Sequence, residues 1–138
     1  MTQGPTEVLK TGLELPLIGA PMFLASGVDL VVAQCCAGVI GTFPALNARP
    51  AAELDNWLVQ IEARLDAHRH ATGKTPAAYG VNLIVNDYNE RLEEDLATLV
   101  RHKVPLVITS LSAPDKVVEA VHGYGGLVFH LSLIHISE

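Results

Sequence analysis

Cysteine is almost absent from this sequence of 138 residues. The chain has two cysteines, Cys35 and Cys36, and they are adjacent within an apolar stretch. Adjacent cysteines suit neither an ordinary disulfide nor a CxxC metal or redox site. We therefore interpret both as small hydrophobic residues that the fold buries.

Charge is also scarce, since charged residues make up 17% of the chain and the formal net charge is −6. No run of lysine and arginine is present to neutralise phosphates, which argues against nucleic acid or an anionic membrane as a partner. No apolar run approaches the length of a membrane span, and the N-terminus has no signal-peptide pattern. The sequence thus predicts a cytoplasmic protein whose partner is a small molecule.

Several well-known catalytic motifs are missing. The sequence has no GxGxxG fingerprint, Walker loop, HExxH motif or nucleophile elbow, and its histidines form no pattern typical of metal ligands. Nicotinamide-binding Rossmann domains, nucleotide hydrolases, zinc proteases and α/β-hydrolases therefore lose their main support. We expect no metal site.

Apolar residues, by contrast, make up 49% of the chain. Five short apolar runs do not alternate with polar residues, which is typical of parallel strands covered on both faces. Four segments of helical periodicity separate them; Ser26, followed by Asp29, indicates the start of the first. The longest, about residues 51–70, places Leu54, Leu58 and Ile61 on one face. The five predicted strands are residues 17–20, 39–43, 79–85, 104–109 and 126–130.

This alternating order of strands and helices predicts a parallel sheet with right-handed crossovers. Two α/β architectures fit it. A five-stranded doubly wound sheet would be complete near this length, whereas a (β/α)₈ barrel needs about 250 residues.

In either architecture a ligand binds at the carboxyl ends of the strands. Asn82 is the most informative residue there, because an amide between Val81 and Leu83 costs a few kcal/mol if it is buried without partners. His130 could donate to a ring carbonyl or act as a base, but a structural histidine is the favoured interpretation from the residue alone. The strand ends also carry Pro21, Met22, Thr42, Thr109 and Ser110.

Four segments carry a resemblance to a known family. LIGAPM at 17–22, GTFPALNARP at 41–50, YGVNLIV at 79–85 and HKVPLVITSL at 102–111 resemble successive strand ends of the nitronate monooxygenases, formerly called 2-nitropropane dioxygenases. The resemblance extends over most of residues 15–130. It implies an FMN-binding (β/α)₈ barrel and so favours the barrel over the doubly wound sheet. It also implies the oxidation of alkyl nitronates by dioxygen.

The resemblance implies roles for particular residues. Ala20, Pro21 and Met22 would lie along the flavin, Asn82 would hydrogen-bond it, and Thr109 and His130 would face the same cavity. The family's catalytic histidine would lie beyond this segment. No catalytic residue is therefore assigned within it.

Residues 1–130 would be the N-terminal part of the barrel, about five β/α units. Residues 131–138, LSLIHISE, resemble a translated sequencing adaptor and would form a non-native tail. Such a truncated chain is expected to bind FMN weakly and to be inactive. The sequence does not predict the oligomeric state or the particular nitronate.

Two alternatives remain open. An FMN-dependent enoyl reductase shares the GAPM opening and would use NAD(P)H. A non-catalytic flavodoxin-like binding domain would be complete near this length.

Overall fold

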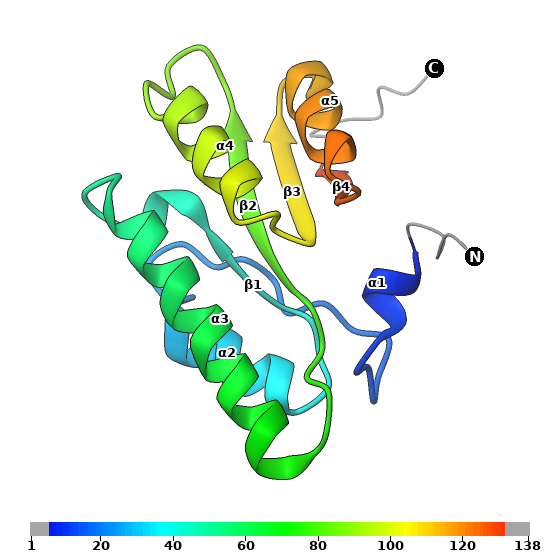
Figure 1. Ribbon diagram of the computed structural model, residues 1–138. Coiled ribbons are helices and arrows are strands. Elements are labelled where there is room, and N and C mark those ends of the chain that lie inside the picture. The colour runs from blue at the N-terminus through cyan, green and yellow to red at the C-terminus, as the bar shows by residue number, and fades with distance from the viewer. Residues whose placement is uncertain (1–5, 132–138) are drawn as a thin grey trace.

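The computed structural model describes residues 6–131, and its helices and strands follow the predicted order (Figure 1). Four helices separate the predicted strands, as expected, and a short helix near the N-terminus was not predicted. The strands are β1 (Gly41–Pro44), β2 (Tyr79–Val85), β3 (Leu106–Leu111) and β4 (Leu127–Leu131). The helices are α1 (Glu7–Lys10), α2 (Val28–Cys36), α3 (Glu53–Thr72), α4 (Leu92–Arg101) and α5 (Asp115–Gly123), with a 3₁₀ turn, η1, at Ala45–Asn47.

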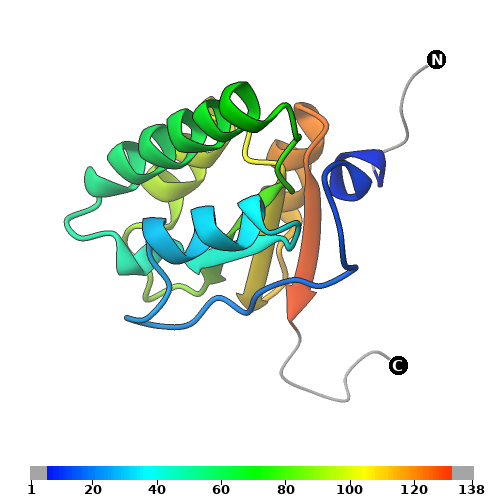
Figure 2. The ribbon, with the colours of Figure 1, turned by 90° about the horizontal axis from the view of Figure 1, so that it is seen from below.

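The strands form one parallel sheet in the order β1-β2-β3-β4. Each strand pairs with the next along the chain, as in a (β/α)₈ barrel. A doubly wound sheet instead reverses its order at a switch point and carries helices on both faces. Here helices α2 to α5 pack on one face, so the flavodoxin-like alternative is excluded (Figure 2).

The first predicted strand, residues 17–20, is only partly formed. It contributes a single parallel bridge between Ile18 and Ile40, with hydrogen bonds from Gly19 N to Ile40 O and from Ile40 N to Leu17 O. Prolines at positions 16 and 21 flank this segment and lack the amide that would extend the ladder. The five predicted strands are thus four strands and one bridge.

The main core lies between the helices and the sheet. Helix α3 buries Leu54, Leu58, Ile61 and Leu65, the apolar stripe that the sequence predicts. The Phe43 ring of β1 packs against Trp57 of α3 with 5.5 Å between centroids, and Cys35 of α2 is also buried in this core. A smaller cluster on the face opposite helices α2 to α5 contains Ile40, Leu106 and Ile108, and Leu9 of α1 and Leu13 pack against it.

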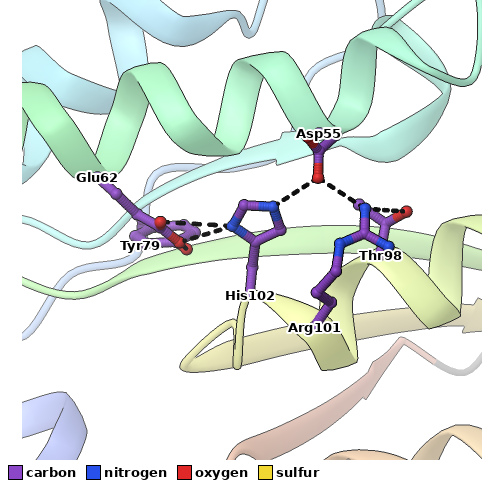
Figure 3. A network of polar contacts seen from close by, with 6 residues as sticks. All are labelled: Asp55, Glu62, Tyr79, Thr98, Arg101 and His102. Carbon is purple, nitrogen blue, oxygen red and sulfur yellow. Dashed lines mark hydrogen bonds and ion pairs between the residues drawn. The ribbon is translucent and has the colours of Figure 1, made fainter.

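A polar network joins α3 to the end of α4 (Figure 3). His102 lies between two carboxylates, with Nε2 2.8 Å from Asp55 Oδ1 and Nδ1 3.2 Å from Glu62 Oε1. Arg101 also donates to Asp55 Oδ1, and the Tyr79 hydroxyl donates to Glu62. The hydrogen bonds from Arg101 and, to a lesser degree, from His102 hold the pKa of Asp55 below its usual value.

No helix among the described residues is long and apolar enough to cross a membrane.

The lowered pKa of Asp55 predicts that the stability of the fold depends on pH. The ionised carboxylate stabilises the fold above the pKa of an unfolded aspartate, about 4, and this contribution is lost as the pH falls through the folded value. We therefore expect Asp55→Asn to lower the Tm at about pH 7 and the difference from wild type to shrink towards about pH 3. Thermal unfolding followed by circular dichroism measures this, with Asp66→Asn, which loses an exposed contact to Arg69, as the control. A difference that stays constant with pH would contradict the argument.

Candidate site at the carboxyl ends of the strands

The loop at residues 20–26, between the Ile18 bridge and α2, is closed on itself by Ser26. The Ser26 hydroxyl accepts a hydrogen bond from Met22 N at 2.9 Å and donates to Ala20 O at 3.4 Å. Ser26 N donates to Met22 O at 3.0 Å. The interpretation of Ser26 as a helix cap is wrong, because α2 begins after Gly27 without a side-chain cap and the hydroxyl is used inside the loop.

Asn47 in η1 holds this loop from the side of β1. Its Nδ2 donates to Met22 O at 3.0 Å and to Ser26 O at 2.9 Å, and its Oδ1 accepts from Leu24 N at 3.0 Å. Asn47 lies within the segment 41–50 that resembles the nitronate monooxygenases, but no feature of the sequence predicted its contacts with the loop. A loop asparagine has no periodicity that would reveal a contact more than twenty residues away.

The loop presents apolar side chains to solvent on an unusual backbone. Met22, Phe23 and Leu24 are 45%, 61% and 74% exposed, and the Arg49 guanidinium lies 5.3 Å from the Phe23 ring centroid. Leu24 has φ +62°, and Leu111, which ends β3, has φ +80°. A left-handed backbone costs a leucine about 1 kcal/mol or more, and such residues cluster at functional sites.

Asn82 of β2 lies on the face of the sheet opposite helices α2 to α5, beside β3. It is 6% exposed, and its Nδ2 donates to Ile108 O at 2.9 Å and to Ser110 Oγ at 2.8 Å. Its Oδ1 accepts no hydrogen bond from any residue between 6 and 131. Protein groups therefore use the donors of this amide, and the acceptor remains available to a ligand. Thr42, another strand-end candidate, is buried and donates to Gly19 O, which ties β1 to the preceding segment.

Thr109 and His130 lie on the opposite face of the sheet from Asn82. Thr109 is in register with Leu83, whose side chain is in the core between helices and sheet, and alternate residues of a strand face opposite sides. Thr109 Oγ1 is 2.9 Å from His130 Nδ1, so these two side chains contact each other instead. Ser110, not Thr109 or His130, is thus the polar neighbour of Asn82. Flavin contact by Ala20, Pro21, Met22, Asn82, Thr109 and His130 stays a prediction.

Arg91 supports η1 from the start of α4. Its guanidinium donates to Ala48 O at 2.8 Å, to Ala45 O at 3.3 Å and to Asp95 Oδ1 at 2.9 Å. Asp95 is 1% exposed, and this burial raises the pKa of its carboxyl, an effect that the hydrogen bond from Arg91 partly offsets. The ion pair therefore anchors the segment that carries Asn47.

Hollows occur at both ends of the sheet. One of about 520 Å³ lies at the amino end of β2, beside Glu62, Ala77 and Tyr79. One of about 400 Å³ lies at the carboxyl end, beside Ile84, Asn86 and Arg91. Barrel enzymes assemble their sites at the carboxyl ends of the strands, whereas the amino ends serve stability. The smaller of these two hollows thus lies at the end of the sheet where a site is expected. Residues 6–131 contain no cluster of histidine, cysteine and acidic side chains that could hold a metal ion.

Comparisons with known proteins support this fold. No protein-family model matches the chain, and no curated protein matches it. The chain is similar in structure to FabK from Thermotoga maritima, with a TM-score of 0.72 and 19% identity over 94% of this chain and 37% of that chain. It is also similar to the enoyl reductase domain of MlnA from the macrolactin biosynthesis cluster of Bacillus amyloliquefaciens, with a TM-score of 0.59 and 21% identity over 78% of this chain and 23% of that chain.

The chain therefore has the fold of a portion of a (β/α)₈ barrel, as the sequence predicts. It spans 37% of the length of the FabK chain that it matches. At these identities the likeness establishes the fold alone.

The contacts of Asn82 predict the cost of removing its amide. Asn82→Ala leaves Ile108 O and Ser110 Oγ without their donor, which should lower the free energy of unfolding by about 1 to 3 kcal/mol. Urea unfolding measures this. The matched control is Asn56→Ala on the exposed side of α3, where the amide donates to Glu53; it should change the value by less than about 0.5 kcal/mol. Equal effects of the two substitutions would show that Asn82 does not stabilise the sheet.

Proposed function

We propose that the carboxyl end of this sheet forms part of an FMN site in a flavin-dependent oxidoreductase. The observation that carries the proposal is the Asn82–Ser110 pair, a nearly buried amide on the face opposite helices α2 to α5 whose Oδ1 accepts no hydrogen bond from residues 6–131. The likeness to an enoyl reductase domain and to FabK supports the proposal. The ordered loop at residues 20–26 supports it as well, because it offers fixed backbone groups at the same end of the sheet.

The residues present fit the ring system of FMN better than its phosphate. An isoalloxazine ring has flat apolar faces and a polar edge that both donates and accepts hydrogen bonds. Pro21 and Met22 offer an apolar surface, and Asn82 Oδ1 offers an acceptor for a ring N–H. Neither loop 20–26 nor the Asn82–Ser110 pair carries a positive charge, so we assign them to the ring.

Each part of the chain would have a limited task in the reaction. Bound here, the flavin would supply the electron transfer. Asn82 would bind and orient the ring, and Met22 and Phe23 would exclude water from its apolar part. The chain's own residues would thus position the cofactor.

Two substrates are candidates for this site. Nitronate oxidation by dioxygen is the leading proposal, since the four motif segments resemble nitronate monooxygenases. Enoyl reduction with NAD(P)H is the second, because one structural neighbour is an enoyl reductase domain. The two differ in what reduces the bound flavin.

Nuclear magnetic resonance can test the flavin site directly. We expect FMN, added up to about 1 mM, to shift the amide signals of residues 20–26, the side chain of Asn82 and the amide of Ser110. Riboflavin, which lacks the phosphate, should shift the same signals if these residues bind the ring. Asn82→Ala should weaken the effect and Asn56→Ala should not. The absence of shifts, or shifts confined to Ala77 and Ala78 at the amino end, would overturn the proposal.

The choice of substrate can be tested by anaerobic reduction of the flavin. In a full-length enzyme that contains this segment, we expect an alkyl nitronate to bleach the absorbance of bound FMN without NAD(P)H, whereas the segment alone is expected to be inactive. Bleaching by NADH or NADPH instead would favour the enoyl reductase. Free FMN with each reductant is the control for the uncatalysed reaction.

A further inference from the structure

The loop at residues 20–26 is held in a conformation that its own sequence does not favour. Leu24 is in the left-handed region, and the side chains of Met22, Phe23 and Leu24 face solvent rather than the core. An unsupported loop of this composition would relax its backbone and cover its apolar side chains. The contacts that prevent this should therefore decide the shape of the loop.

Asn47 makes contacts of that kind at three points. It accepts from the amide of Leu24, the strained residue itself, and donates to the carbonyls of Met22 and Ser26 on either side of it. One amide side chain thus spans the turn and fixes both the donor and the acceptor groups of the backbone.

Arg91 in turn fixes the position of Asn47. Its guanidinium donates to the carbonyls of Ala45 and Ala48, which bracket Asn47 in the chain, and pairs with the buried Asp95 of α4. Hydrogen bonds therefore connect α4 to η1 and η1 to loop 20–26, at the same end of the sheet.

We propose that Asn47 is a positioning residue that holds loop 20–26 in the form that receives the ligand, and that Arg91 fixes the turn that carries it. That the ligand is a flavin rests on the proposed function. The positioning itself does not, because the contacts are present in the protein alone.

Hydrogen exchange of single amides tests the positioning without a ligand. In Asn47→Ala we expect the amides of Met22, Leu24 and Ser26 to exchange roughly tenfold faster, because one hydrogen bond is lost outright and two neighbours lose support. The amides of β2 should keep their rates. A purely structural role would instead lower the unfolding midpoint and speed exchange in β2 as well, which would overturn the proposal. So would unchanged exchange at Leu24.

Two further variants keep the test decisive if Asn47→Ala does not fold. Asn47→Asp retains an acceptor for the Leu24 amide, so protection of Leu24 should persist while that of Ser26 falls. Arg91→Lys keeps a cation beside Asp95 but does not span both carbonyls, and should speed exchange in loop 20–26 roughly threefold. Asn56→Ala is the control for an asparagine outside the network. Wild-type rates in loop 20–26 of both variants would overturn the proposal.

Ligand binding separates this inference from the proposed function. Asn47→Ala should lower the affinity for FMN roughly tenfold, as measured by a titration followed by the amide shifts. The reason is that the loop must first return to its receptive form. If the exchange rates change as expected but wild type does not bind FMN, the positioning stands and the proposed function fails. If wild type binds FMN and Asn47→Ala binds it equally well, the positioning role fails.

Discussion

Alternation of side chains along β2 is the constraint on which the rest of the structure depends. Val81 and Leu83 face the helices and join the main core, so Asn82 between them must face the other side. A shift of one residue in register would bury the amide among the helices and expose two large apolar side chains. The hydrophobic packing of α3 and α4 therefore places the polar group of the candidate site, although that group lies on the opposite face of the sheet.

The two ends of the sheet are stabilised in different ways. At the amino end, His102 and two carboxylates link α3 to α4 by contacts between oppositely charged or hydrogen-bonding side chains. At the carboxyl end, side chains such as Asn47 and Arg91 bond mainly to backbone carbonyls and amides, and they hold left-handed Leu24 and its exposed neighbours in place. The first arrangement joins helices, and the second shapes loops. This division agrees with the general use of the two ends in barrels.

The sequence predicts the fold more completely than the site. Periodicity identified the four main helices and the buried stripe of α3, and the apolar runs identified β1 to β4, because both patterns reflect burial. The sequence patterns did not predict how far the first strand extends, because a single residue, Pro21, limits that strand to a bridge. Apolar runs without alternation do not reveal which residues face which side, so the sequence did not show that Thr109 and His130 lie on the opposite face of the sheet from Asn82. Asn47 was missed because its partners are distant in the chain.

The order β1-β2-β3-β4 also bears on how the chain reaches its structure. Each strand pairs with the one that precedes it in the sequence, so each newly formed strand–helix unit finds its partner already in place. Paired residues of neighbouring strands lie between 21 and 38 residues apart in the sequence, so each pairing closes a loop of a few dozen residues. During synthesis on a ribosome, the sheet can therefore grow by one unit at a time as the chain emerges, and slow pairing between distant segments is avoided.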